Sequence, residues 1–300
     1  MNLPAMKTPG RKLREALFKP PLVIPGVFNA LTARMAERAG FQAGYQSGAA
    51  LSASLAAVPD VGLLSQSEFA QQGHYLVSAV NIPILSDADT GFGEALSVER
   101  TVREFEAAGL AGLHLEDQEL PKRCGHLSGK SLVAPEVMIS KIRAAVSARR
   151  DSDFVIIART DARSCEGMDA AVERAKRYVE AGADWIFPEA LESLQEFEEF
   201  SEAVPVPVMA NMTEFGRSPL LTAKELGEAG VAAVLFPVTL LRAAMKAVQE
   251  MLGLLASAGT QRELIDSLQT RAELYDLLNY SEFDQRDRRY FGGAIRSKES

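Results

Sequence analysis

The stretch Val98–Leu115, VERTVREFEAAGLAGLHL, contains the pattern that decides the fold. Val98, Val102 and Phe105 recur at spacings of four and three, which indicates a helix with one apolar face. The Ala-Gly pair that follows ends this helix, because glycine suits the left-handed position after a helix. The run Leu110–Leu115 is short and almost continuously apolar, as a strand of a helix-covered parallel sheet must be. The stretch therefore predicts one helix–strand unit.

The same phrase, an Ala-Gly pair before a short apolar run, recurs at Ala39, Ala181 and Ala229. Together with four further strand-sized runs it predicts eight strands alternating with helices. The expected strands are Leu22–Ile24, Phe41–Tyr45, Ile82–Leu85, Leu110–Leu115, Phe154–Ala158, Ala183–Phe187, Val206–Ala210 and Val231–Phe236. This alternation indicates an α/β protein with a (β/α)₈ TIM-type barrel. The alternative is an open doubly wound sheet, but Pro25-Gly26-Val27 after the first strand is not a phosphate-binding fingerprint.

The C-terminal part exceeds what one closing helix needs. A single barrel domain over 1–300 is expected, with its core at about 20–240 and a helical segment at about 241–300. Within that segment, Leu241–Ala256 and Gln261–Leu278 read as long helices, followed by a polar tail. We expect this segment to pack across a subunit interface.

Composition narrows the class of protein. Of the 300 residues, 47% are hydrophobic and 24% charged, and the net charge of −8 argues against nucleic acid or an anionic membrane as a partner. The longest apolar run, Val231–Pro237, is far shorter than the roughly 18 residues that a membrane helix needs. Two cysteines are too few for a disulfide framework, and so a reduced cytoplasmic location is expected.

Polar residues follow the expected strands where barrel enzymes carry their chemistry. The residues at the strand ends are Ser47, Asp87, Glu116, Arg159, Glu189 and Asn211. Converging carboxylates repel one another unless a cation lies between them, and Mg²⁺ prefers a few carboxylates plus water. Asp87 and Asp89 alternate along the chain and can face the same side, although an Asx turn with a helix cap is the simpler reading of that string. His114 and Glu116 alternate in the same way, which favours His114 as a hydrogen-bonding support for the acids.

The loop Pro121–Lys130 carries a cysteine in an unusual setting. Cys124 lies among Lys122, Arg123 and His126, which favour a thiolate and predict a reactive cysteine. Glycines in the second half of the loop permit a closing motion. A basic surface loop with an incidental cysteine is the alternative. Cys165 has no comparable setting and is expected to be structural.

With these motifs, the chain resembles the isocitrate lyase / phosphoenolpyruvate mutase superfamily along nearly its whole length. The segments that carry the resemblance are Ser47–Ala49, Asp87–Gly93, Leu115–Gln118, Pro121–His126, Ala158–Ala162, Asn211–Gly216 and Thr270–Tyr275. Lys122–His126 is the most specific of them. The likeness is greatest to the branch that cleaves 2-methylisocitrate.

The resemblance implies a homotetramer in which neighbouring subunits exchange the last helix. It implies Mg²⁺, or Mn²⁺ as an alternative, held by Asp87 and Asp89, with Glu116 engaged partly through water. It implies retro-aldol-like cleavage of (2S,3R)-2-methylisocitrate to pyruvate and succinate. The implied substrate contacts are Ser47, Gly48, Ala49, Cys124, Gly125, Arg159, Glu189, Asn211, Met212, Thr213, Arg242 and Arg271. The implied supporting residues are Asp60, His114, Glu116, Lys122 and His126.

The chemistry of such a cleavage needs a base for the hydroxyl proton and an acid for the carbanion. Cys124 is the expected acid, Tyr45 the expected base, and Arg159 a group that neutralises substrate carboxylate. A thiol in a basic setting loses its proton easily, whereas an acid must keep it. The sequence leaves that balance open.

Three other functions compete with this hypothesis. Ala49 and the residues after it resemble the corresponding segment of relatives that cleave the dicarboxylates 2,3-dimethylmalate or oxaloacetate. Arg242 and Arg271 favour a tricarboxylate instead, because a third carboxylate needs extra cations. Cys124 argues against a phosphoenolpyruvate mutase-like isomerase. The retained acids and arginines argue against a barrel without catalytic function.

Overall fold

The computed structural model describes residues 7–18, 21–127 and 129–291. Its parallel strands lie in two hydrogen-bonded sheets, ordered β2-β3-β4-β5-β6 and β1-β8-β7. Single bridges from Gly26 to Tyr45 and from Ile186 to Val208 join the two sheets and close the ring. The strands are β1 (Leu22–Pro25), β2 (Gly44–Gln46), β3 (Ile84–Asp87), β4 (Gly112–Glu116), β5 (Val155–Thr160), β6 (Trp185–Pro188), β7 (Met209–Asn211) and β8 (Ala233–Phe236). The predicted (β/α)₈ barrel is confirmed.

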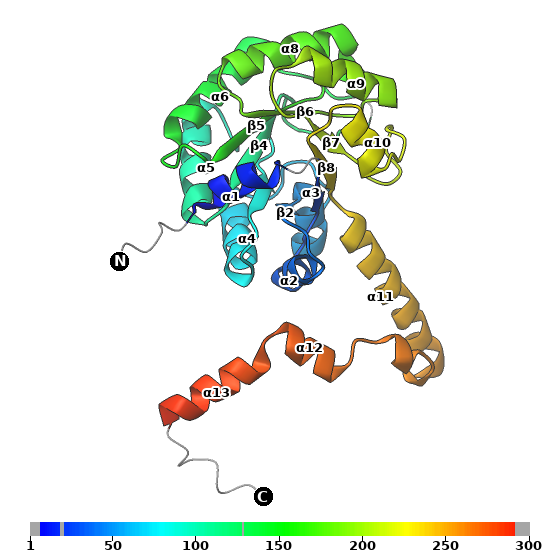
Figure 1. Ribbon diagram of the computed structural model, residues 1–300. Coiled ribbons are helices and arrows are strands. Elements are labelled where there is room, and N and C mark those ends of the chain that lie inside the picture. The colour runs from blue at the N-terminus through cyan, green and yellow to red at the C-terminus, as the bar shows by residue number, and fades with distance from the viewer. Residues whose placement is uncertain (1–6, 19–20, 128, 292–300) are drawn as a thin grey trace, which may run out of the picture. The chain divides into compact units, whose positions relative to one another are not determined.

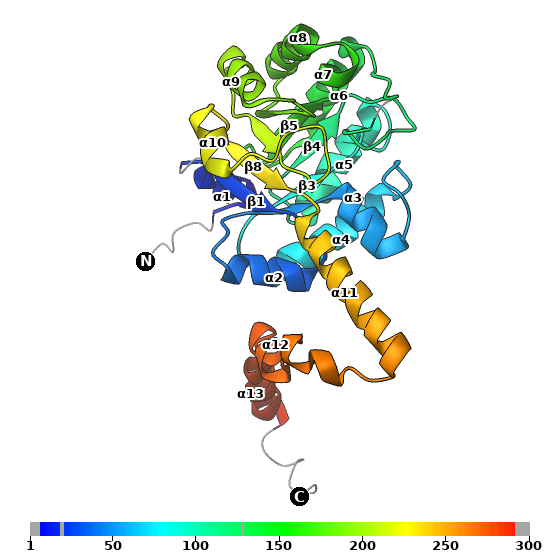
Figure 2. The same cartoon turned by 90° about the vertical axis from the view of Figure 1, so that its right-hand side faces the viewer.

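Helices surround the strands (Figures 1 and 2). They are α1 (Pro9–Ala16), α2 (Ala30–Arg38), α3 (Gly48–Leu51), η1 (Ser52–Ala56), α4 (Gln66–Ala79), α5 (Ala95–Ala107), α6 (Pro135–Ala148), α7 (Ala162–Cys165), α8 (Met168–Glu180), α9 (Leu194–Ala203), α10 (Ala223–Glu228) and α11 (Thr239–Ala258). The glycines of the four Ala-Gly pairs all have positive φ, between 84° and 107°, as a left-handed helix end requires.

Most of the strands begin two or three residues later than the apolar runs do. Leu110 and Ala111 are buried, yet β4 starts only at Gly112. Ala111 still donates its backbone N–H to the Ile84 carbonyl at 2.8 Å and accepts the Val155 N–H at 3.0 Å. The apolar run therefore marks a slightly longer buried segment than the strand itself.

Side chains alternate between two hydrophobic clusters. Leu85, Ile157, Phe187 and Met209 fill the inside of the barrel, whereas their sequence neighbours pack outward against the helices. The inner cluster includes Leu13 of α1, which is fully buried, and so α1 closes one end of the barrel. In Figure 1, α1 crosses in front of the strands. The sequence reading did not anticipate this helix.

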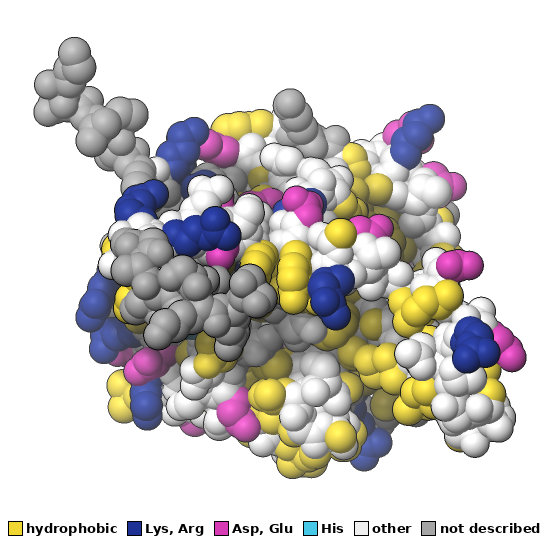
Figure 3. Space-filling view, turned by 90° about the horizontal axis from the view of Figure 1, so that it is seen from below, with side chains coloured by type: hydrophobic (Ala, Val, Ile, Leu, Met, Phe, Trp, Pro, Cys, Tyr) yellow, Lys and Arg dark blue, Asp and Glu magenta, His cyan; other side chains and the backbone are white. Residues whose placement is uncertain are grey.

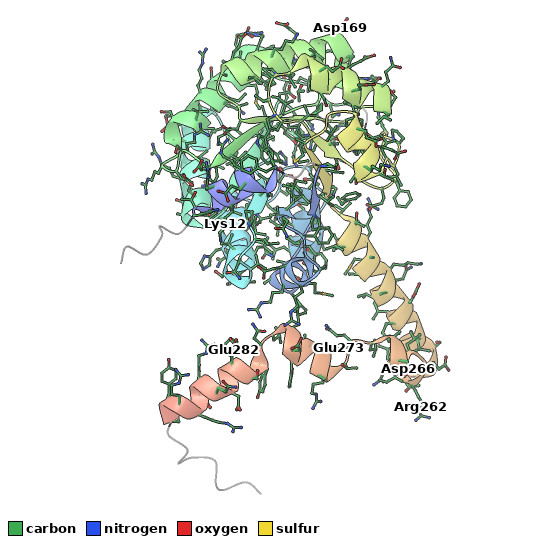
Figure 4. All side chains as sticks on the ribbon, in the orientation of Figure 1. Lys12, Asp169, Arg262, Asp266, Glu273 and Glu282 are labelled. Atoms are coloured by element: carbon green, nitrogen blue, oxygen red, sulfur yellow. The ribbon has the colours of Figure 1, made fainter. Side chains whose placement is uncertain are left out.

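Leu13→Ala should therefore destabilise the barrel without touching the site. We expect a loss of about 2–5 kcal/mol in the free energy of unfolding, because the truncation leaves a cavity in a closed core. Denaturant unfolding measures it. Lys12→Ala is the control, since its Nζ only caps the Asn81 carbonyl at 3.0 Å on the surface (Figure 4). Equal effects of the two changes would contradict a closing role for α1.

The chain divides into two compact units between Ala243 and Ala244, and each is described by itself. The C-terminal unit holds most of α11, followed by η2 (Arg262–Ser267), α12 (Arg271–Leu277) and α13 (Tyr280–Phe291). The expected helix at 241–256 lies within α11. The expected helix at 261–278 is wrong, because Leu268 is extended and Thr270 starts α12 with a capping box to Glu273.

Many apolar side chains of the C-terminal unit are exposed. Met245, Val248, Leu252 and Leu255 recur at spacings of three and four along α11 and form one face. Tyr275 and Tyr280 stack with ring centroids 4.7 Å apart. In the part of the chain that the structure describes, no helix is both long and apolar enough to span a membrane.

Candidate active site

Buried polar side chains gather at the carboxyl ends of the strands. Because Leu85, Ile157 and Phe187 point into the barrel, the residues two positions later, Asp87, Arg159 and Glu189, point there as well. Strand register places Glu116 directly beside Arg159. The six predicted strand-end residues are all buried: Ser47, Asp87, Glu116, Arg159, Glu189 and Asn211. One end of the barrel thus carries an unusual concentration of charge.

Asp87 and Asp89 converge beside Gly48. A methyl group at Gly48 would lie 2.7 Å from Asp87 Oδ2 and 3.4 Å from Asp89 Oδ1, so both carboxylates face the same space. Asp87 also accepts the backbone N–H groups of Gly48 at 3.1 Å and of Asp89 at 2.9 Å. The second of these bonds is an Asx turn, so the turn and the paired carboxylates exist together.

Lys122 turns inward, contrary to its expected role as one of the bases around Cys124. Only 2% of the residue is exposed, and its Nζ pairs with Asp89 Oδ1 and, at 2.6 Å, with Asp60 Oδ1. Burial raises the pKa of Asp89 to about 7 despite this ammonium, with Asp87 and Asp60 adding repulsion. The pKa of Asp87 is lowered to about 2, where His114 and Lys122 outweigh its burial. Burial also holds the pKa of Glu116 well above its usual range.

These features fit a divalent cation. Raised pKa values at Asp89 and Glu116 show that nearby cations do not fully compensate the acids, and Glu116 Oε1 is buried without a hydrogen-bond partner. Among the described residues, no three His, Cys, Asp or Glu side chains form a metal cage. Mg²⁺ commonly binds through one or two carboxylates and keeps several waters, so a pair such as Asp87 and Asp89 suffices.

His114 and Tyr45 form a buried pair below the acids. The Tyr45 hydroxyl lies 2.7 Å from His114 Nε2, which is 3.5 Å from Asp87 Oδ1. His114 therefore lies between the Tyr45 hydroxyl and Asp87. Burial, followed by the charge of Asp87, holds the pKa of Tyr45 well above its usual range. This pKa favours the protonated phenol, and the assignment of Tyr45 as the base stays a prediction.

The charge of Arg159 is already shared among three carboxylates. Its guanidinium contacts Glu116 at 3.4 Å, Asp161 at 3.0 Å and Glu189 at 3.0 Å. Arg159 is expected to neutralise a substrate carboxylate, and the structure adds that carboxylates of the protein itself already engage its guanidinium. Asp161 was missed, although it follows Arg159 at the same alternation that identified the other acids.

Glu189 connects this network to the loop after β4. It contacts His126 Nε2 at 2.9 Å and accepts weak bonds from Asn211 Nδ2 at 3.3 Å. The backbone N–H of Arg217 donates to His126 Nδ1 at 2.9 Å. Nδ1 is therefore an acceptor, and Nε2 carries the proton that is donated to Glu189.

Cys124 does not behave as its basic neighbours suggest. The residue is exposed, yet partial burial of the thiol raises its pKa above the ordinary value, with Glu189 and Asp60 adding to the effect. Lys122 and His126, expected to favour a thiolate, are instead paired with carboxylates. The raised pKa thus favours the protonated thiol, which an acid catalyst needs, over the thiolate that the basic neighbours suggest. Cys165, expected to be structural, is exposed.

The remaining predicted contacts are more varied. Ser47 caps α3, where its Oγ accepts the Ala50 N–H at 3.3 Å. Ala49 and Thr213 are partly exposed near the strand ends. Met212 is a correction, because its side chain packs in the hydrophobic core between strands and helices, away from the barrel interior.

Two further arginines were predicted to contact substrate. Arg242 is half-exposed, contacts Glu214 at 3.5 Å and covers the Phe215 ring at 5.3 Å. Arg271 begins α12 in the C-terminal unit and is exposed. Within the first unit, Arg242 therefore contacts Glu214 and Phe215 and not the buried network.

Comparison with known proteins shows the family to which this chain belongs. A model of the family described as phosphoenolpyruvate phosphomutase matches residues 13–256. The chain belongs to this family. It is 53% identical over 283 residues to 2-methylisocitrate lyase from Aeropyrum pernix, which covers 94% of this chain and 91% of that one.

Solved structures of the family share the fold. A 2,3-dimethylmalate lyase is 34% identical with a TM-score of 0.90, covering 98% of this chain and 99% of that one. A phosphonopyruvate hydrolase in complex with oxalate and Mg²⁺ is 34% identical with a TM-score of 0.86, covering 95% and 100%. Family members thus act on small acids, and one of them holds magnesium.

Proposed function

We propose that this chain cleaves 2-methylisocitrate to pyruvate and succinate with the help of a divalent cation. The observation that carries the proposal is the place of Cys124 in the fold: the next residue, Gly125, lies against Arg159 and Glu189 at the barrel end that holds Asp87 and Asp89. The raised pKa of the Cys124 thiol suits an acid catalyst. The likeness to 2-methylisocitrate lyase supports the choice of substrate. The substrate would also contact Ser47, Gly48, Ala49, Gly125, Asn211 and Thr213.

Asp87 and Asp89 would hold Mg²⁺, or Mn²⁺ in its place, with Glu116 engaged through water. When bound, the ion would supply positive charge to the substrate oxygens that become pyruvate. Lys122 and Asp60 would adjust around it, since the Lys122 ammonium now neutralises Asp89. The Mg²⁺-bound relative supports this assignment.

The protein side chains divide the remaining work. A base removes the hydroxyl proton, the carbon–carbon bond breaks as the carbonyl of pyruvate forms, and the carbanion of succinate takes the proton from Cys124 Sγ. Arg159, held by three carboxylates, orients Glu189 and faces the substrate as part of a fixed network. His126 keeps Glu189 and the cysteine loop together.

We infer a homotetramer with an exchanged last helix, acting in the cytosol on small di- or tricarboxylates. The exposed apolar face of α11 supports a protein partner for that helix. On the face that Figure 3 views, Lys and Arg side chains are scattered among acidic and hydrophobic ones, which does not favour nucleic acid or an anionic membrane.

A dicarboxylate lyase is the second candidate, because the 2,3-dimethylmalate lyase shares the fold over nearly the whole chain. Oxaloacetate is another dicarboxylate of this kind. The distinction rests on Arg242 and Arg271, now that Arg159 is known to be neutralised within the protein. Cys124 continues to argue against an isomerase.

Steady-state assays on a panel of acids test the substrate. We expect kcat/KM for 2-methylisocitrate to exceed that for 2,3-dimethylmalate or oxaloacetate at least about tenfold, because a charge-assisted hydrogen bond contributes roughly 1.5–3 kcal/mol. Arg271→Ala should shrink the gap.

Arg262→Ala is the matched control, as Arg262 is an exposed arginine of the same unit (Figure 4). It should leave the ratio unchanged. Comparable efficiency on a dicarboxylate, insensitive to Arg271, would move the assignment to that branch.

A further inference from the structure

Lys130 is a buried cation to which neither the sequence reading nor the proposed reaction assigns a role. Its side chain is 1% exposed, although it lies on a loop. The Nζ contacts Asp161 Oδ1 at 2.7 Å and donates to the carbonyl oxygen of Gly125. A buried ammonium group needs hydrogen-bond acceptors around it. Here one acceptor is the backbone carbonyl of Gly125, so Lys130 also binds the turn that follows Cys124.

The loop is closed at its base, so that Lys130 reaches across it. Gln118 and Leu132 form an antiparallel bridge, and the Glu119 N–H donates to the Ser131 carbonyl at 2.8 Å. Gln118 also holds the backbone of Arg123 through two bonds of 2.9 Å. Gln118 thus holds the part of the loop that leads up to Cys124, and Lys130 holds the Cys124–Gly125 turn.

The turn lies directly on the charged network. A methyl group at Gly125 would fall 2.3 Å from Arg159 Nη2 and 2.4 Å from Glu189 Cγ, so the backbone can lie there only because residue 125 is glycine. Asp161 binds both Lys130 and Arg159, with Nε of Arg159 at 3.0 Å. One carboxylate therefore connects the turn to the guanidinium beneath it.

Asp161 is itself fixed from behind the strands. Its backbone N–H donates to Asp117 Oδ1 at 2.9 Å, and Asp117 Oδ2 accepts Thr160 Oγ1 at 2.8 Å and the Tyr178 hydroxyl at 2.9 Å. Arg174 contacts the same Tyr178 hydroxyl at 3.1 Å. Asp161 thus stands on a rigid support within the barrel wall.

We propose that Lys130 is a positioning residue, which clamps the Cys124–Gly125 turn to Asp161 and so holds the Cys124 thiol over Arg159 and Glu189. The clamp itself depends only on the geometry, whereas its effect on turnover rests on the proposed function. If Lys130 contacted Asp161 alone, it would only neutralise that carboxylate. Because Lys130 also donates to the Gly125 carbonyl, it holds the residue next to Cys124 as well.

The test replaces Lys130 by Met in a Cys165→Ser background, which leaves Cys124 as the one thiol of the chain. Asp161 keeps Arg159 as a partner in this variant, and so the fold should be retained. Alkylation of Cys124 by iodoacetamide at neutral pH should become about fivefold faster or more, because a released thiol is less buried and forms thiolate more readily. With 2-methylisocitrate, kcat should fall about 10–100-fold, with KM little changed.

Lys130→Arg, which keeps the charge and several donors, should recover part of both effects. Lys224→Met is the control, because Lys224 is an exposed lysine with only a distant partner, Glu228 at 3.8 Å. If Lys130→Met does not fold, Lys130→Gln offers the same comparison with a polar side chain. Thermal melting verifies folding in each case.

An unchanged alkylation rate in a folded Lys130 variant would overturn the clamp, even if the wild-type chain cleaves 2-methylisocitrate. A faster alkylation in a chain that does not act on 2-methylisocitrate would support the clamp and reject the proposed function. A fall in kcat with unchanged alkylation would assign Lys130 to charge balance alone.

Discussion

Cys124→Ser is expected to lower kcat by about 10² to 10⁴, the usual effect of removing a general acid. A serine hydroxyl fills the same place but gives up its proton far less readily than the thiol. Binding of succinate or pyruvate should persist, because Arg159, Glu189 and His126 keep their mutual contacts. A coupled assay for pyruvate and calorimetric titration with succinate measure the two quantities.

The pH profile gives a second readout for Cys124. An acid catalyst acts in its protonated form, and the pKa of this thiol is raised by burial and by Glu189. Activity should therefore persist through the ordinary thiol pKa and fall only above it. Cys124→Ser should remove that alkaline limb.

Cys165→Ser is the matched control for this prediction. Cys165 is also exposed. Its sulfur lies 3.8 Å from both the Lys130 carbonyl oxygen and Ser164 Oγ, and neither of these two groups is charged. The activity of the Cys165→Ser variant should be near that of the wild type. Equal and small effects of the two substitutions would show that Cys124 is an incidental thiol.

Asp87→Asn should abolish metal binding and activity, with a fall of at least about 10³-fold at limiting metal. The amide cannot balance a divalent charge beside Asp89. We choose Asn because Asp87 is buried and accepts two backbone N–H groups, one on each carboxylate oxygen. The amide oxygen of Asn can keep one of these bonds, whereas Ala would leave both donors unpaired. Titration calorimetry with Mg²⁺ and Mn²⁺ measures the binding, and thermal melting the fold.

Asp169→Asn provides the control for Asp87. Asp169 is exposed in the first turn of α8, on the outside of the barrel (Figure 4), and its change removes the same charge from a distant surface. It should leave metal affinity and activity unchanged. Full activity of the Asp87 variant, or of wild-type protein freed of metal as verified by elemental analysis, would refute the metal assignment.

Much of this site follows from local pattern. An Asx turn, not strand alternation, brings Asp89 to the side of Asp87, because Asp89 lies beyond the end of β3 and has a φ of 46°. Alternation along a strand is a property of the backbone, and therefore the positions of His114 and Glu116, which both lie in β4, follow from their spacing once the strand is known. The same rule would have identified Asp161 after Arg159. The helix ends at the Ala-Gly pairs could also be predicted from the local sequence, because glycine adopts the left-handed conformation without a steric penalty.

The sequence by itself thus determined the barrel, the end of it that carries the polar residues, and the side to which those residues point. Only the tertiary structure decided which charges are already paired. Lys122 and His126 looked like basic neighbours that favour a thiolate at Cys124, but each is bound to carboxylates from distant strands or loops. Arg159 is likewise paired with carboxylates of the protein. Charge compensation and desolvation depend on atoms brought together by folding, and these two effects set the pKa of Cys124, Tyr45 and Asp89.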